Sequence, residues 1–136
     1  MINRSVVRHK LADLFGEEVL SAQAIIPYQT VDFQGQSPVI LIMSAGSLRP
    51  TRRLTQHQMY VILNIYVNIS ENVTSADEAE DLIDLLEFEI HSSLEAHDTD
   101  DLWLGYNVEN ASLVDKIVIG DPYLFESIPL VFTLRG

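Results

Sequence analysis

A segment of strict alternation between Met59 and Ile69 constrains the fold of this chain more than any other feature. Every second residue from Met59 is apolar, whereas the residues between them mix aromatic, amide and apolar side chains. Because successive side chains of a strand point to opposite faces, the pattern predicts a strand with one face in a hydrophobic core. The other face, which carries Tyr60 and Tyr66, is expected to meet solvent or a neighbouring subunit. Burial under a helix of the same chain is the alternative for both tyrosines.

The next segment, Ser75–His97, predicts a long amphipathic helix. Apolar residues recur at steps of three and four on one side, and acidic residues fall mostly on the other. Ser75 and Glu78 have the spacing of a capping box, in which the serine side chain accepts a hydrogen bond from the first turn. We therefore expect this helix to pack its apolar stripe on the sheet and to expose its acidic side.

Shorter patterns predict the other elements. Asn3–Phe15 carries an apolar stripe and predicts a first helix, with Gly16 as its stop. Strands are expected at Glu18–Tyr28, Val39–Met43 and Phe125–Leu134, and short strands or irregular pieces at Leu102–Glu109 and Lys116–Ile119. Turns or loops are expected at Asp32–Pro38, Ser44–Gln56 and Asp121–Pro122. Pro129 indicates a sheet edge or a bulge in the last strand.

These elements follow one another in the order α-β-β-β-α-β-(β)-β, which predicts the α+β class. We expect an antiparallel or mixed β-sheet flanked by two α-helices. A chain of 136 residues, 47% of them hydrophobic, is long and apolar enough to bury one core. The sequence holds no internal repeat and no linker, so residues 1–136 are expected to form a single domain.

Composition excludes several classes of function. The chain carries 8 Lys and Arg against 20 Asp and Glu, a formal net charge of -12. A surface this acidic repels phosphate, which opposes non-specific binding of nucleic acid. There is no cysteine, which excludes a disulfide framework and a thiolate zinc site. The longest apolar stretches are too short to cross a bilayer, so we expect no membrane partner.

The sequence offers no catalytic or cofactor-binding motif. It lacks the phosphate-binding glycine loop, the nucleophile elbow and the H-E-x-x-H pair. His91 and His97 are six residues apart, which does not match paired metal ligands on a helix. Asp98–Asp101 resembles a fragment of a calcium loop but lacks its glycine and distal glutamate. We therefore expect no enzyme activity, no metal and no cofactor, and carboxylates after Ser75–His97 that are solvated or meet a positive partner.

The distribution of charge suggests contacts between copies of the chain. No Lys or Arg lies between Arg53 and Lys116, and 14 acidic residues do. The loop that contains Arg49, Arg52 and Arg53 would complement the acidic helix of another copy. A solvated loop is the alternative, and nucleic acid threading past a ring of such loops is a third. The candidate residues for a subunit or tail-tube interface are Arg49, Arg52, Arg53, Tyr60, Tyr66, Asp81, Asp84 and Glu87.

The chain resembles the tail terminator family of tailed bacteriophages, in particular its lambda-like members. The resemblance covers almost the whole chain and lies in length, element order and hydrophobic texture, with no signature motif. It is carried by the short N-terminal helix, the strand in Ser37–Ile42, the basic loop, the alternating strand Tyr60–Ile69, the acidic helix Ser75–His97 and the terminal strand Leu124–Leu134.

The resemblance implies a homohexameric ring that caps the completed tail tube, stops its polymerisation and offers a surface for joining the head. Its implied partners are further copies of itself, the tail tube protein and a head completion or connector protein, and DNA only passes through the lumen. The implied location is the head-proximal end of the virion tail, after assembly in the cytoplasm of a bacterial host. Ser44–Gln56 would correspond to the family's long loop and face the tube or the lumen.

Two other classes of protein stay open at this stage. One is a head–tail connector or another neck or tail-completion protein, which differs in the partner that it meets. The other is a small α+β ligand-binding domain or enzyme, which would need a pocket with convergent polar groups. Its candidate lining residues are Trp103, Tyr106 and His97.

Overall fold

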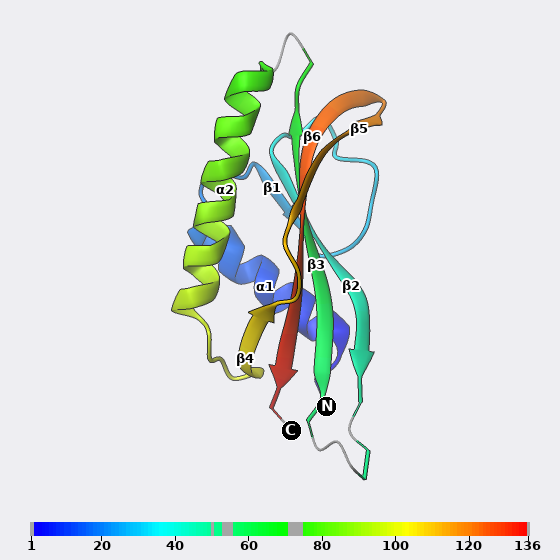
Figure 1. The fold of residues 1–136 in the computed structure, drawn as a ribbon, viewed down its shortest axis with the longest axis vertical. Helices are drawn as coiled ribbons and strands as arrows, with labels where there is room; N and C mark the ends of the chain where they lie inside the picture. The colour runs from blue at the N-terminus through cyan, green and yellow to red at the C-terminus, as the bar shows by residue number, and fades with distance from the viewer. Residues whose placement is uncertain (1, 50, 53–55, 71–74, 136) are drawn as a thin grey trace.

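A computed structural model describes residues 2–49, 51–52, 56–70 and 75–135 of this chain. Two helices and six strands follow one another in the predicted order. Figure 1 shows an elongated molecule in which the long strands run along the longest axis and α2 lies beside them. The elements are α1 (Arg4–Glu18), β1 (Ala24–Ile26), β2 (Val39–Leu48), β3 (Gln58–Asn68), α2 (Ala76–Ala96), β4 (Trp103–Val108), β5 (Leu113–Ile119) and β6 (Asp121–Leu134).

The six strands form one mixed sheet, which confirms the predicted α+β class. The strand order is β1-β2-β3-β6-β4, and β5 pairs with β6 on the same side as β4. Only β1 and β2 are parallel, and every other pair is antiparallel. Apolar residues of α1 and α2 join those of one sheet face in a single cluster, so both helices cover that face. The opposite face is called the open face below.

The alternating strand and the amphipathic helix are placed as predicted. On β3 the residues of the apolar parity from Met59 to Val67 are each at most 2% exposed and face the helices. On α2 the buried residues follow the predicted stripe. Ser75 Oγ accepts a hydrogen bond from the backbone N–H of Glu78 at 3.3 Å, which starts the helix at its predicted cap.

Tyr66 is buried neither by a neighbouring subunit nor by a helix of the same chain. It lies on the open face and is 8% exposed. Phe33, from the connection between β1 and β2, covers it with a ring-centroid distance of 5.0 Å, and Phe125 stacks on it at 5.8 Å. Tyr123 closes the cluster edge-on at 6.2 Å from Tyr66. The covering segment is therefore a loop and a hairpin of the same chain, and the upper half of the open face forms a second core.

The boundary between α1 and β1 differs from the prediction. Glu18–Tyr28 was expected to be a strand, but α1 continues through Gly16 to Glu18, and β1 is three residues long. Gly16 does not end the helix because it does not adopt the left-handed conformation of a glycine stop. The backbone N–H of Val19 still donates to Phe15 O at 2.8 Å, and Phe15 and Val19 are both buried, so packing extends the helix.

One predicted loop is strand over its first five residues, and one predicted turn lies inside a strand. β2 runs on to Leu48 because Ser44–Leu48 still pairs with β3, past an irregularity at Gly46, whose φ is 143°. Asp121–Pro122 opens β6, and the turn falls at Gly120 with φ 74°. The Pro122 carbonyl accepts from Ile69 N at 3.0 Å, beyond the end of β3. Pro122, which has no N–H to donate, therefore lies beyond the end of β3, where no residue of that strand needs a donor from it.

Pro129 marks a gap between two neighbouring strands. It lies inside β6, opposite Ile62 of β3. Its carbonyl accepts from Glu109 N at 2.9 Å, so its nitrogen also points to the side where β4 ends and β5 begins. No neighbouring strand requires an N–H donor from Pro129 in that gap. Pro129 was expected to mark a sheet edge or a bulge. It lies instead in an internal strand, at the point where the neighbouring strand changes from β4 to β5.

The packing of α2 on the sheet gives a matched test. Leu86 is fully buried, whereas the adjacent Leu85 is 47% exposed. Leu86→Ala is expected to lower the free energy of unfolding by about 2–5 kcal/mol, because it leaves a cavity. Leu85→Ala should change it by no more than about 0.5 kcal/mol. Urea unfolding of both variants measures the difference, and equal losses would contradict this orientation of the helix.

Candidate functional site

The basic loop lies at the end of the molecule where β2 turns back into β3. Arg49 and Arg52 are exposed, and Arg53 lies outside the described residues. In Figure 1 this connection projects from the lower end of the sheet. The carbonyl of His57, just before β3, accepts from Leu134 N at 2.8 Å, which fixes the loop's second end against the end of β6.

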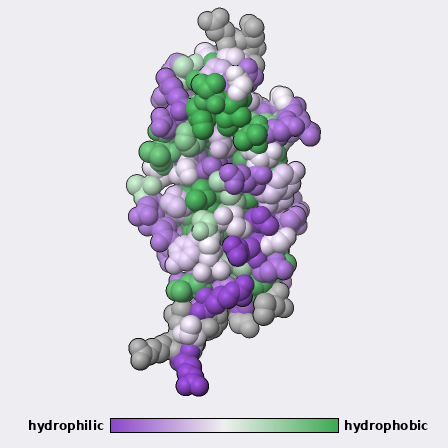
Figure 2. All heavy atoms as spheres, turned by 90° about the vertical axis from the view of Figure 1, so that its right-hand side faces the viewer, coloured by the Kyte–Doolittle hydropathy of each residue, from purple (hydrophilic) through white to green (hydrophobic). Residues whose placement is uncertain are grey.

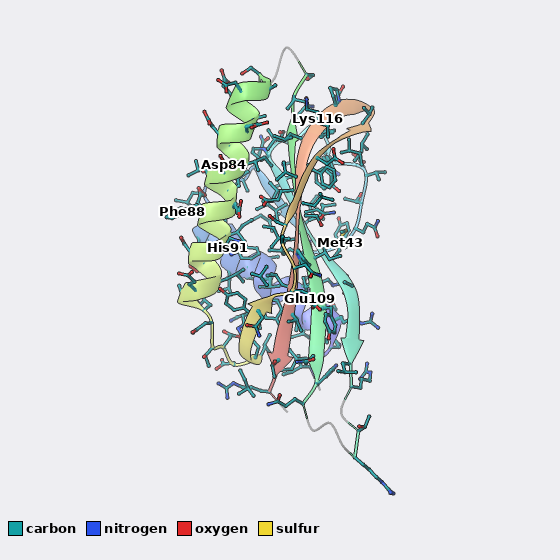
Figure 3. All side chains as sticks on the ribbon, viewed as in Figure 1. Met43, Asp84, Phe88, His91, Glu109 and Lys116 are labelled. Atoms are coloured by element: carbon teal, nitrogen blue, oxygen red, sulfur yellow. The ribbon has the colours of Figure 1, made fainter. Side chains whose placement is uncertain are left out.

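The acidic candidates lie on α2 and do not meet the basic loop within one chain. Asp81 and Asp84 are exposed, and Glu87 is half-buried. Figure 3 shows Asp84 in the half of α2 that is farther from the basic loop, and His91 nearer to it. Glu87 Oε1 lies 3.8 Å from His91 Nε2. The predicted charge pairing therefore requires a second molecule.

The two tyrosine candidates have different surroundings. Tyr66 is part of the aromatic cluster on the open face, so it offers no surface for a neighbouring subunit. Tyr60 is half-buried and stands in the row that joins Gly46 of β2 to Val131 of β6. Of the pair, only Tyr60 can contribute to an interface in this conformation.

Large apolar side chains are exposed on α2 and along the β4–β5 side of the sheet. Phe88 of α2 is 69% exposed and points away from the sheet in Figure 3. On the open side, Figure 2 shows apolar side chains gathered toward the upper end of the molecule. Clusters of this kind mark contact sites more often than isolated apolar residues do. The residues along β4 and β5 that are exposed by 37% or more are Leu104, Val108, Leu113, Val114, Ile117 and Val118.

Glu126 is a charged residue that the sequence interpretation did not single out. It lies on β6, on the face covered by the helices, and is 1% exposed. Neither of its carboxylate oxygens has a hydrogen-bond partner at ordinary distance and angle among the described residues. Its parity is that of Ile128 and Leu130, which the sequence places on one face, so extending that alternation by two residues would have found a carboxyl group in the core.

The environment of Glu126 favours its neutral form. The pKa of Glu126 is raised from 4.5 to about 7. Burial is the largest cause of the rise, the carboxylates of Glu87 and Asp84 on α2 contribute to it, and the Ser112 hydroxyl limits it by favouring the charged form. The group therefore changes charge near neutral pH, close to Glu87 and Asp84 of α2.

The structure gives no support to a ligand pocket lined by the expected residues. Trp103 is fully buried, and its indole N–H donates to the carbonyl of His97 at 2.9 Å. His97 Nε2 pairs with Glu18, which ties the ends of the two helices together. Tyr106 is half-buried beside Phe132, with ring centroids 6.1 Å apart. These side chains serve packing and do not converge on a common cavity.

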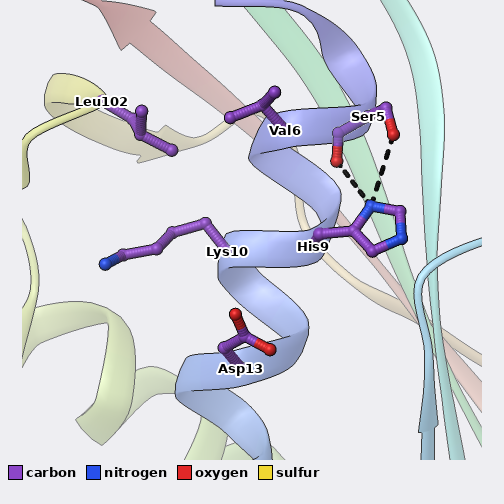
Figure 4. A pocket seen from close by; sticks show the side chains of 6 residues that line it. All are labelled: Ser5, Val6, His9, Lys10, Asp13 and Leu102. Carbon is purple, nitrogen blue, oxygen red and sulfur yellow. Dashed lines mark hydrogen bonds between the residues drawn. The ribbon is translucent and has the colours of Figure 1, made fainter.

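A shallow hollow on α1 also lacks convergent polar groups. Figure 4 shows its six lining side chains. His9 Nδ1 is within 2.7 Å of the backbone carbonyl of Ser5, one turn earlier in the same helix. Lys10 Nζ lies 3.6 Å from Asp100 Oδ1. His9 and Lys10 are thus engaged by other groups of the chain, and the arrangement resembles an ordinary helix surface.

Metal sites and membrane spans are not found in the part of the chain that the structure describes. Within residues 2–49, 51–52, 56–70 and 75–135, no three His, Asp or Glu side chains are arranged to hold a metal ion. None of the described helices combines the length and apolar character needed to cross a membrane. No known protein family matches the chain, and no curated protein sequence does either.

Glu126 gives a pH-dependent prediction. Its pKa is raised in the folded chain, so between pH 4.5 and about 7 the unfolded chain loses this proton first, and stability falls as pH rises. Glu126→Gln removes this loss. The variant's gain in free energy of unfolding should be near zero at pH 4 and reach about 3 kcal/mol at pH 8, at about 1.4 kcal/mol for each unit of pKa difference.

Urea unfolding from pH 4 to pH 8 measures this gain. Glu109→Gln is the matched control, because Glu109 is exposed at the end of β4 and should change stability little at any pH. A gain for Glu126→Gln that stays constant with pH would contradict the raised pKa.

Proposed function

We propose that this chain is a structural protein of a bacteriophage or prophage tail, a tail terminator whose copies form a ring on the end of the tail tube. The ring stops further addition of tube subunits and presents the surface that a head completion or connector protein joins. The chain acts without a cofactor and without catalysis. DNA passes through the lumen of the ring, which lies at the head-proximal end of the virion tail after assembly in the host cytoplasm.

The observation that carries this proposal is the separation of complementary surfaces on one chain. Arg49 and Arg52 are exposed in the loop after β2, whereas exposed carboxylates lie elsewhere on the chain, at Asp81 and Asp84 of α2 and at Asp98 and Asp101 in the turn before β4. Complementary patches at different places on one subunit make head-to-tail contacts, which close into rings when the rotation permits. Exposed apolar residues on β4, Leu104 and Val108, add surface that a neighbour would cover.

The first experiment measures the mass of the chain by light scattering after size exclusion, at low and high salt, with and without magnesium. The proposal predicts a discrete species near six times 15.3 kDa in at least one of these buffers. Salt or magnesium matters because copies that each carry a charge of -12 repel one another.

The second experiment adds the chain to polymerising tail tube protein from the same phage and measures tube length by electron microscopy. A terminator shortens the tubes and is found at one tube end. Tubes of unchanged length would contradict the proposal. Binding to the portal or head completion assembly without any effect on tubes would instead assign the chain to the connectors.

Charge reversal in the basic loop gives a matched prediction for assembly. Arg52→Glu is expected to lower the association constant at least about tenfold, equivalent to about 1.4 kcal/mol, because it replaces an attraction between copies by a repulsion. Lys116→Glu changes the net charge equally, but Lys116 lies on β5 near the other end of the molecule (Figure 3). Its effect should stay below about twofold. Equal effects of the two variants, compared by light scattering in one buffer, would show that only net charge matters.

A further inference from the structure

Two strand segments of the sheet lack a neighbour on one side. β1 pairs only with Val39–Leu41, so Ile42–Leu48 of β2 has β3 on one side and no strand of the described chain on the other. β4 pairs with β6 on one side, and no described strand pairs with its other side. Unpaired N–H and C=O groups along such edges are templates for a strand from another molecule.

The two free segments lie at the same level along the sheet. A row here means a line of residues that are paired directly opposite one another across neighbouring strands. Leu48 of β2 shares a row with Gly105 of β4, through Gln58 and Thr133. Four residues back along β2, Ser44 shares a row with Val108, and that row passes through Val61 and Leu130. Three antiparallel pairings separate β2 from β4, so the two strands run in opposite directions. A rotation about an axis parallel to the strands would thus bring β4 of one copy antiparallel to β2 of the next, at the same height.

The chemistry of the two edges is complementary. Leu48 on one edge and Leu104 and Val108 on the other are each exposed by 43–45%. Arg49 and Arg52 follow β2, whereas the exposed carboxylates of the turn before β4 belong to Asp98 and Asp101.

The basic loop and this acidic turn lie at the same end of the sheet. The backbone N–H of Leu134 donates to His57 O at 2.8 Å, and that of Arg135 donates to Leu102 O at 3.0 Å. Figure 1 shows the β2–β3 connection and the connection from α2 to β4 at the lower end. Antiparallel pairing would therefore bring the arginines of one copy toward the acidic turn of the next.

We propose that copies of this chain join edge to edge, with Ser44–Leu48 of β2 in one copy paired antiparallel to Gly105–Val108 of β4 in the next. Arg49 and Arg52 of the first copy then meet Asp98 and Asp101 of the second. This inference rests on the proposed ring and names the contact that builds it. In this contact the acidic partner of the basic loop is the turn before β4 and not α2, because Asp81 and Asp84 lie toward the other end of the molecule. The pairing is confined to one end, since β1 occupies the outer side of β2 at Val39–Leu41.

Cysteine cross-linking tests the strand pairing directly, because the chain contains no natural cysteine. Leu48→Cys and Gly105→Cys are made in separate chains. Both residues lie on the open face in the row of Gln58, so the proposed pairing places them directly opposite each other, and a Cβ at Gly105 would meet no atom within 4 Å. A mixture of the two variants, oxidised at a concentration where light scattering shows assembly, should give a disulfide-linked dimer, since a disulfide forms only between Cα atoms within about 7 Å.

The matched control mixes Leu48→Cys with Val118→Cys, whose residue is 74% exposed on β5 and outside the proposed contact. This mixture should give no linked dimer. A linked dimer in the control alone, or assembly without linkage of positions 48 and 105, would overturn the edge pairing and leave the ring proposal standing. A wild-type chain that stays monomeric in every buffer and with tail tubes would contradict the ring itself.

A charge exchange tests the second part of the contact. Asp101→Arg combined with Arg52→Glu restores the net charge of the wild type. The double variant should regain at least about half of the decrease in the logarithm of the association constant that Arg52→Glu causes, because the pair is re-formed with exchanged signs. Asp84→Arg combined with Arg52→Glu has the same net charge and should recover none of it. Recovery by Asp84→Arg instead would place the basic loop on α2 and contradict the edge pairing.

Discussion

The antiparallel pairing of β3 with β6 is the interaction on which the rest of the structure depends. The register runs without a break from Gln58 opposite Thr133 to Asn68 opposite Tyr123. Each strand turns one row of apolar side chains toward the helices and another row toward the open face. A slip of one residue would exchange these faces, so that Asn64 and Asn68 would enter the helix-covered core. The fixed register therefore decides which side α1 and α2 can cover.

Because β3 and β6 occupy the middle of the sheet, the shorter or partly paired strands lie at its edges. β1 covers the outer side of β2 over three residues, and β4 and β5 divide the outer side of β6 between them. The gap between β4 and β5 is where Pro129 can stand in an internal strand. The open segments of β2 and β4 follow from this division, and they are the parts of the sheet that a second copy can extend.

Glu126 breaks the pattern of an otherwise apolar row on β6. A buried carboxyl group without a well-formed hydrogen bond lowers stability at neutral pH, and Asp84 and Glu87 of α2 add two further acidic groups near it. A cation near the outer side of α2 would ease this repulsion. The site thus makes the stability of the helix packing sensitive to proton and salt concentration.

Periodicity correctly predicted the elements whose formation depends least on contacts with distant parts of the chain. β3 and α2 each carry a long regular pattern, and Ser75 supplies a local cap, so their positions followed from the sequence. The extension of β2 to Leu48 could not be predicted, because its polar residues are held by pairing with β3. Burial of Tyr66 depends on Phe33, thirty-three residues earlier in the chain, and no local signal announces that contact.

The candidate site was only partly accessible to sequence reasoning. Composition identified the basic loop and the acidic helix, but it gave no information on their positions at different ends of the sheet. The acidic turn at Asp98–Asp101 was noticed as a place for a positive partner, and the rows of the sheet supply the reason to pair it with Arg49 and Arg52. Sheet rows are set by long-range register, which a single sequence does not reveal.

Hydrogen exchange of backbone amides, compared between dilute and assembled protein, tests the central claim most directly. Pairing between copies predicts that amides in Ser44–Leu48 and in Leu104–Val108 exchange more slowly on assembly. Amides of α2 around Asp84 should exchange at the same rate in both states. Slower exchange confined to α2, or assembly with no change in either strand segment, would contradict a ring built through the edges of the sheet.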